Sequence, residues 1–197
     1  MTKIILASNN QNKVAEVKEI LKDKNVEIVS LKEAGIDVDV EENGTTFEEN
    51  ALIKARAVCK MTGSVTMADD SGLEVDYLDK QPGVYSARFM GHDTSYDIKN
   101  KAIIDKLEGV EGDARSARFV AAIAVVFPDG KEIVTRGTME GLIAREPAGD
   151  NGFGYDPIVY LPEYGMTSAQ LSPEEKNKIS HRGKALKKMA EELKGIL

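Results

Sequence analysis

The chain of 197 residues is poor in cysteine and in long apolar runs, and its basic residues are fewer than its acidic ones. A single cysteine, Cys59, excludes an internal disulfide framework and is typical of a reducing compartment. No apolar run approaches the length of a membrane span, and the apolar start at Met1 is too short for a signal peptide. We therefore expect a cytoplasmic protein with no membrane partner.

Acidic residues outnumber basic ones by 33 to 26, which gives a net charge of −7. Nucleic acids and anionic membranes require a positive surface, so a nucleic-acid partner is not expected. A small polyanionic ligand is still compatible, because a metal ion and a local basic cluster can reverse the field inside one cleft. Chain length fits one domain with two lobes, with residues 108–113 as the predicted boundary between them.

Apolar spacing predicts a mixed α/β fold. Strands are expected at residues 3–7, 26–30, 65–67, 73–75 and 119–127, and helices at 46–62, 95–107 and towards the C-terminus. In the helix at 95–107, Ile98, Ile103 and Leu107 are expected to face the core. Asp129-Gly130 is a strong hairpin signal, so part of the sheet must be antiparallel.

The stretch Ala68-Asp69-Asp70-Ser71-Gly72 follows a predicted buried strand and is expected to end it in a turn. Adjacent side chains on a strand point to opposite faces, so at most one carboxylate faces a given cleft. Carboxylates beside apolar residues need a cation or water to offset desolvation. A metal site and an Asx turn capped by Asp69 or Asp70 are about equally compatible with the pattern.

Two further polar stretches are candidates for ligand binding. Ser8 to Lys13 joins a strand to a helix, where backbone amides and Lys13 could hold a phosphate, although Asn10 or Asn12 could simply cap the helix. No Gly-rich Walker pattern is present, so P-loop chemistry is not indicated. Asn50 and Lys54, one turn apart on the helix at 46–62, could reach a cleft or form a solvated stripe.

The loop at residues 147–157 contains an exposed-looking Phe153-Gly154-Tyr155, on which a flat ligand could stack. The alternative is a structural turn whose aromatic rings enter the core. Downstream, Lys176, His181 and Arg182 offer donors near a helix break at Ser180, or they are solvated helix residues.

These stretches occur together in an order that resembles the inosine triphosphate pyrophosphatase family. The motifs are Ser8-x-Asn10-x-x-Lys13, Thr46-Phe47-x-x-Asn50-Ala51, Ala68-Asp69-Asp70-Ser71-Gly72-Leu73, Pro82-Gly83-x-x-Ser86-Ala87-Arg88, Gly152-Phe153-Gly154-Tyr155-Asp156-Pro157 and Lys176 with Ser180-His181-Arg182. The resemblance covers Ser8 to Arg182, and is therefore far more specific than any single motif.

The resemblance implies an elongated mixed α/β sheet flanked by helices, with a cleft between two lobes, in a homodimer. It implies hydrolysis of ITP, dITP and XTP to the nucleoside monophosphate and pyrophosphate with Mg²⁺. Asp70 carries over as general base, Glu41 and Asp70 as metal ligands, and Asp69 as a supporting acid and further candidate ligand. The implied substrate-binding residues are Ser8, Asn9, Asn10, Gln11, Asn12, Lys13, Ser71, Phe153, Gly154, Tyr155, Asp156, Lys176, His181 and Arg182.

Three points stay open at this stage. Glu42 is adjacent to Glu41, and the register decides which is the ligand. Donors at Lys176, His181 and Arg182 suit a 6-oxo purine over adenine, but no residue explains how guanine is excluded. The alternatives to this enzyme are a nucleotide-sensing module without catalysis and a pyrophosphatase for another modified nucleotide.

Overall fold

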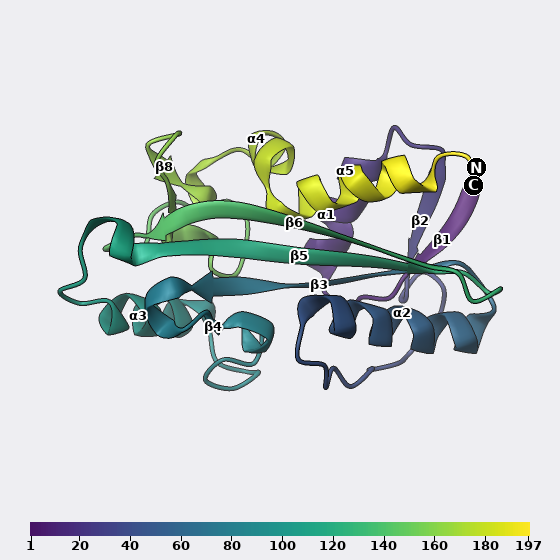
Figure 1. The fold of residues 1–197 in the computed structure, drawn as a ribbon, viewed down its shortest axis with the longest axis horizontal. Helices are drawn as coiled ribbons and strands as arrows, with labels where there is room; N and C mark the ends of the chain where they lie inside the picture. Colours follow the sequence, from purple (N-terminus) through teal and green to yellow (C-terminus); the bar gives the residue numbers. More distant parts are fainter. The chain divides into compact units, whose positions relative to one another are not determined.

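The computed structural model describes all residues from Met1 to Leu197 and confirms a mixed α/β fold (Figure 1). The helices are α1 (Gln11–Leu21), α2 (Phe47–Thr62), α3 (Tyr96–Lys106), α4 (Pro173–Ile179) and α5 (His181–Leu193). The strands are β1 (Thr2–Leu6), β2 (Val26–Ser30), β3 (Thr66–Val75), β4 (Gln81–Pro82), β5 (Ser116–Val126), β6 (Glu132–Ile143), β7 (Val159–Leu161) and β8 (Met166–Thr167). None of the helices combines the length and hydropathy that crossing a bilayer requires.

The sheet contains both parallel and antiparallel pairs, as predicted. Its strands follow the order β2-β1-β3-β5-β6-β7-β8, with β4 beside β3. β1 is parallel to β2 and β3, whereas β3 is antiparallel to β4, and β7 is antiparallel to β6 and β8. The predicted turn at Asp129-Gly130 joins β5 to β6, with Gly130 at a φ of +93°.

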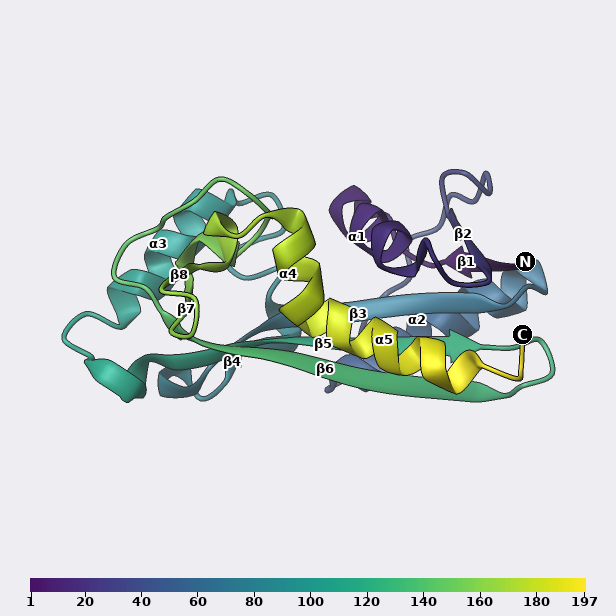
Figure 2. The ribbon, with the colours of Figure 1, turned by 90° about the horizontal axis from the view of Figure 1, so that it is seen from above.

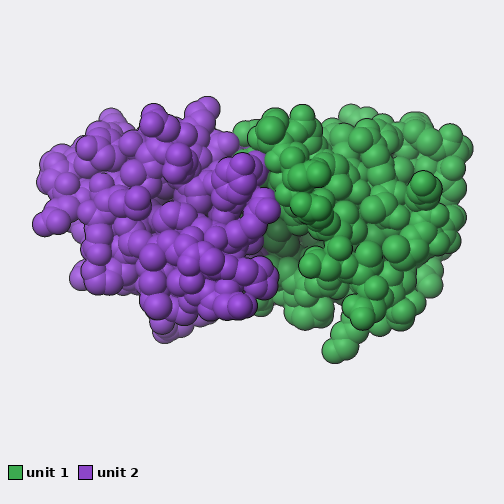
Figure 3. All heavy atoms as spheres, turned by 90° about the horizontal axis from the view of Figure 1, so that it is seen from below, with its two compact units in different colours: residues 1–70, 121–137, 181–197 green, residues 71–120, 138–180 purple.

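The chain divides into two compact units, coloured separately in Figure 3. Unit 1 comprises residues 1–70, 121–137 and 181–197, and unit 2 comprises residues 71–120 and 138–180. The boundary predicted at residues 108–113 is wrong, because this connector lies wholly inside unit 2. The Arg115 guanidinium fastens it by donating to the carbonyls of Leu107 and Val110.

In unit 1, helices cover both faces of the sheet. α1 and α5 lie together on one face, and α2 lies on the other (Figures 1 and 2). The apolar cluster under α1 and α5 includes Val17, Leu186 and Met189, all fully buried. Burial of each such side chain stabilises the fold by about 1.5–3 kcal/mol relative to its exposure.

β3 differs from the prediction at its most informative point. The strand does not end in a turn at Gly72; it runs without interruption from Thr66 through both acids to Val75. The Asx-turn interpretation is therefore wrong, and the acids lie inside a buried strand. The local preference of Asp, Ser and Gly for turns is overridden by strand pairing on both sides of the acidic pair.

α3 in unit 2 also differs from its prediction. Ile98 is 53% exposed, whereas Lys99 and Asn100 are 1% and 2% exposed. Ile103 and Leu107 do face the core, as expected. The first turn of α3 thus turns polar residues inward.

Candidate active site

Asp69 is held in unit 1 by two cations. Its side chain receives Lys13 Nζ at 2.8 Å and Arg182 Nε at 2.9 Å. Burial alone would raise the pKa of this carboxyl, but Arg182 and Lys13 outweigh it and bring the pKa well below its ordinary value. Asp69 is therefore a permanent anion that orders α1 and the start of α5.

Arg182 serves Asp69 and a second acid. The guanidinium, 1% exposed, also donates to Glu16 of α1. Burial would lower its pKa, but Asp69 and Glu16 raise it well above the ordinary range. The base-pocket role that the resemblance implies for Arg182 stays a prediction. In the structure Arg182 pairs with acids of unit 1, whereas Phe153, Asp156 and Lys176 belong to unit 2.

Asp70 has a different environment from its neighbour. Strand alternation turns it to the α2 side, where it is 5% exposed and its Oδ2 has no hydrogen-bond partner. Burial raises the pKa of this carboxyl to about 7, with Glu42 and Asp69 adding to the rise and Lys54 and Lys13 opposing it. A carboxyl with a pKa near neutrality suits a general base.

Lys54 on α2 links the acids of this site. Its ammonium donates to the Asp69 backbone carbonyl at 2.6 Å and pairs with Glu42 at 3.1 Å. The site residues implied by the resemblance do not include Lys54, although its position on the helix allowed it to reach a cleft. The usable signal was its spacing from Asn50, which points both side chains to one face of the helix.

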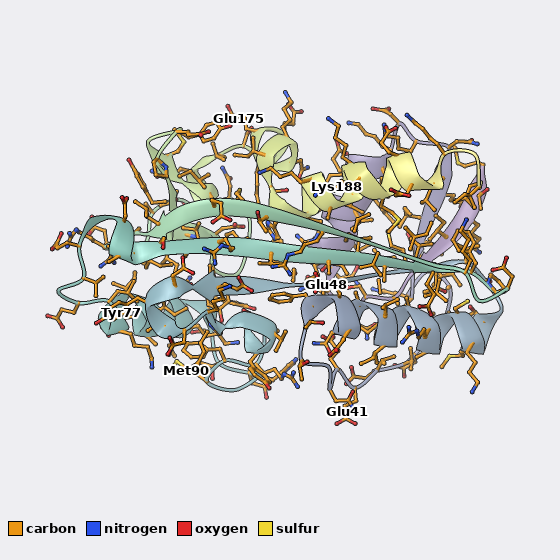
Figure 4. All side chains as sticks on the ribbon, viewed as in Figure 1. Glu41, Glu48, Tyr77, Met90, Glu175 and Lys188 are labelled. Carbon is orange, nitrogen blue, oxygen red and sulfur yellow. The ribbon has the colours of Figure 1, made fainter.

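Glu42, rather than Glu41, faces the acidic pair. Glu41 is exposed and points away from α2 (Figure 4), whereas Glu42 is half-buried against Lys54 and close enough to raise the pKa of Asp70. The structure therefore places Glu42, and not Glu41, on the side of Asp70, and the choice of metal ligand stays a prediction. No group of three or more acids, histidines or cysteines forms a complete set of protein ligands for a metal.

The loop before α1 presents backbone amides at a helix N-terminus. Asn10 is the N-cap, as one interpretation expected, and its Oδ1 accepts from the amides of Asn12 and Lys13. Ser8 Oγ accepts from the Asn10 amide at 3.2 Å, and Asn9 donates to the Val38 carbonyl at 3.0 Å. Gln11 and Asn12 are exposed. Partial positive charge at this helix end, together with Lys13, favours a phosphate.

In unit 2, Phe153, Asp156 and Lys176 form one cluster. Asp156 Oδ2 accepts from Lys176 Nζ at 2.6 Å and from the Phe153 amide at 2.9 Å. The Lys176 ammonium lies 5.0 Å from the centre of the Phe153 ring. Gly152 is required here, because a Cβ would overlap the Asp156 carboxylate. A half-buried aromatic face and a fixed ammonium can bind a flat base.

Tyr155 follows the second interpretation of its loop, in which an aromatic ring enters the core. It is 4% exposed, packs in the apolar cluster of unit 2, and donates its hydroxyl to the Ser86 carbonyl at 2.6 Å. Burial raises its pKa, so it remains a neutral donor. The two aromatic residues of the loop therefore differ in burial: Tyr155 lies in the core, and Phe153 is half-buried.

The remaining predicted residues are placed as follows. Ser71 follows Asp70 on β3 and is half-buried at the start of unit 2. His181 begins α5 in unit 1 and is 5% exposed. Gly154 has a φ of +65°, a conformation that favours glycine.

Comparisons with known proteins cover almost the whole chain. The sequence profile of the Ham1 family matches residues 4–192. The chain is 51% identical to the dITP/XTP pyrophosphatase of Clostridium perfringens, with 100% of both chains covered, and 45% identical to that of Bacillus subtilis, with 96% of each covered. It matches the structure of a HAM1 protein from Coxiella burnetii with a TM-score of 0.89 and 43% identity, covering 98% of this chain and 99% of the other. The Staphylococcus aureus Ham1 protein matches with a TM-score of 0.88 and 42% identity, covering 99% and 100%.

Proposed function

Because the chain belongs to the Ham1 family, as its motifs indicated, we propose that it hydrolyses ITP, dITP and XTP to the nucleoside monophosphate and pyrophosphate. One observation carries the proposal: Asp70 is a buried carboxylate with an unpartnered oxygen, beside Lys54, Glu42 and Lys13. Two relatives that are 51% and 50% identical, with at least 94% of each chain covered, are named dITP/XTP pyrophosphatases. Cleansing the nucleotide pool in the cytoplasm is the corresponding role.

The residues present fit a magnesium ion. Asp70 Oδ2 is an oxygen without a donor, and Glu42 supplies a second carboxylate nearby. Mg²⁺ is commonly held by one or two carboxylates together with substrate phosphates and water, so a set smaller than three acids is sufficient. We assign Glu42 and Asp70 as its ligands. Asp69 is not assigned as a ligand, because Lys13 and Arg182 already pair with it. Bound there, Mg²⁺ would neutralise phosphate charge and favour pyrophosphate as leaving group.

The chain's own groups account for the rest of the reaction. Lys13 and the amides at the start of α1 bind and orient the triphosphate, which carries about four negative charges. Asp70 accepts a proton from the water that attacks the α-phosphorus, while the bond to the β-phosphate oxygen breaks. Lys54 holds β3 in place by donating a hydrogen bond to the Asp69 carbonyl, and it partly compensates the negative charge of Glu42. Positioning and charge compensation supply most of the acceleration.

Base recognition falls to unit 2. Phe153 offers a face for stacking, and Lys176, steadied by Asp156, donates to a 6-oxo group. Adenine carries a donor at that position, so the lysine selects against it by about 1–3 kcal/mol. His181 remains a second candidate donor. We further propose a homodimer, which light scattering after size exclusion tests directly.

A substrate panel tests the function. ITP, dITP, XTP, GTP, ATP and dUTP are incubated with the protein and Mg²⁺, and pyrophosphate and orthophosphate are measured separately. We expect pyrophosphate from the first three substrates and little from ATP. Orthophosphate release would contradict cleavage between the α- and β-phosphates. Binding of ITP without turnover would favour a sensor, and preference for dUTP would favour a pyrimidine enzyme.

A further inference from the structure

The first turn of α3 buries polar groups and exposes an apolar one. Lys99 and Asn100 are 1% and 2% exposed, while Ile98 is 53% exposed. Burying a polar side chain costs free energy unless its hydrogen bonds are made, and an apolar side chain would fill the same space at lower cost. The burial of Lys99 and Asn100 is therefore explained by the hydrogen bonds that these side chains make.

Asn100 holds the loop assigned to the base. Its Nδ2 donates to the Gly154 carbonyl at 3.1 Å, between Phe153 and Tyr155 in the chain. Its Oδ1 is buried and has no partner. An amide with only one of its two ends hydrogen-bonded contributes little to stability, so the bond that it does make points to positioning of Gly154.

Tyr96, one turn before Asn100, touches the same loop. Its ring meets the Tyr155 ring edge to face, with centres 5.2 Å apart, and a Cβ at Gly154 would lie 3.7 Å from it. Gly154 and Tyr155 are thus both contacted by α3. α3 also contacts the short helical turn at Asp156–Ile158, which directly follows this loop.

Lys99 completes the arrangement from the other side of the same helix turn. Its ammonium donates to the Ala87 carbonyl at 2.7 Å and lies 4.7 Å from the Tyr96 ring centre. The neighbouring Ser86 carbonyl accepts the Tyr155 hydroxyl. The segment at Ser86-Ala87, the loop at Gly154-Tyr155 and α3 therefore form a closed set of contacts within unit 2.

We propose that Asn100 is a positioning residue for base recognition, acting through the Gly154 carbonyl to fix the Phe153 ring under Lys176. The inference rests on the proposed function and adds to it a residue outside the binding motifs. It predicts an effect on the base and none on the phosphates, because the phosphate-binding residues lie on α1 and β3 of unit 1.

The test is Asn100→Asp, which keeps the shape and removes the donor, with Asn100→Leu as a second variant. Ile98→Ala, on the exposed face of the same helix, is the matched control. For each protein the kcat and KM for ITP are measured with Mg²⁺, together with the inhibition constants of IMP and of tripolyphosphate, which lacks a base. Thermal unfolding sets an assay temperature at which every variant is folded.

We expect the KM for ITP and the inhibition constant of IMP to rise about tenfold in both Asn100 variants, which corresponds to loss of one hydrogen bond. In the Asn100 variants kcat should change less than about threefold, and the inhibition constant of tripolyphosphate less than about twofold. In Ile98→Ala every one of these constants should change less than about twofold. Unchanged KM and IMP constants in folded variants would overturn the inference. Parallel rises for IMP and tripolyphosphate would also overturn it, because they indicate general damage. A wild-type protein that hydrolyses none of ITP, dITP and XTP would instead refute the proposed function.

Discussion

At the scale of single residues, two adjacent carboxylates have opposite electrostatic environments. Asp69 faces Lys13 and Arg182, so its pKa falls, whereas Asp70 lies buried beside Glu42 and its pKa rises to about 7. Alternation along a strand was enough to predict that the two side chains face apart. The partners of Asp69 could not be predicted from sequence, because Arg182 lies 113 positions away and salt-bridge formation depends on the fold.

Asp70→Asn should abolish turnover without unfolding the protein. The amide cannot accept the proton from water, so we expect kcat for ITP to fall by at least about a thousandfold. Removing a buried carboxylate with an unpartnered oxygen should leave the melting temperature equal or higher. Pyrophosphate release and thermal unfolding are measured on the same preparation. Near-normal release by a folded variant would remove Asp70 from the role of base.

Glu42→Gln and Glu41→Gln form a matched pair for the metal assignment. Glu42 is half-buried beside Lys54 and near Asp70, whereas Glu41 is exposed. Only Glu42→Gln should therefore weaken metal binding, which is measured with Mn²⁺ in place of Mg²⁺. We expect a loss of at least about tenfold by titration calorimetry without nucleotide. The reverse order would return the assignment to Glu41.

At the scale of elements, spacing predicted most helices and strands, and the misses share one cause. β3 continues through Asp-Asp-Ser-Gly because neighbouring strands pair with it, and α3 rotates Lys99 and Asn100 inward because carbonyls on two loops accept from them. Local propensity contains neither fact. The helix at residues 46–62, whose start is capped locally by Thr46, was predicted correctly.

Acid should weaken a cross-strand cluster in unit 2. Asp76, directly after β3, accepts from Arg118 on β5 at 2.7 Å and from Ser116 at 2.6 Å, and these bonds lower its pKa. A carboxylate whose pKa is lower in the folded state stabilises the fold at pH above its unfolded-state pKa of about 3.9. This stabilisation is lost as the pH falls through the folded-state pKa. Urea unfolding from pH 6 to pH 2.5 should therefore show wild type losing more stability than Asp76→Asn. Parallel curves would contradict this account.

At the scale of the whole molecule, the order of motifs along the chain was more informative than any one of them. Family and activity class followed from that order, whereas the mixed sheet followed from apolar spacing and the hairpin signal at Asp129-Gly130. The comparisons with Ham1 proteins confirm the family and the fold. The division into units did not follow, because each unit is assembled from segments distant in sequence.

Substrate choice should respond to Lys176→Ala. Loss of the ammonium removes the donor proposed for the 6-oxo group, so we expect the ratio of kcat/KM between ITP and ATP to fall about tenfold or more. Asp156 would lose its cationic partner, so the melting temperature is compared with that of Lys178→Ala, a lysine two positions along α4. An unchanged ratio in a folded variant would exclude Lys176 from base selection.

The ion pair between Asp69 and Arg182 can form only late in synthesis of the chain. The ribosome completes residue 69 long before residue 182 emerges, so a nascent chain carries this acid without the guanidinium that compensates it in the finished protein. Truncated chains that end before α5 should therefore pair Asp69 with Lys13 alone and order β3 less well than the full chain does.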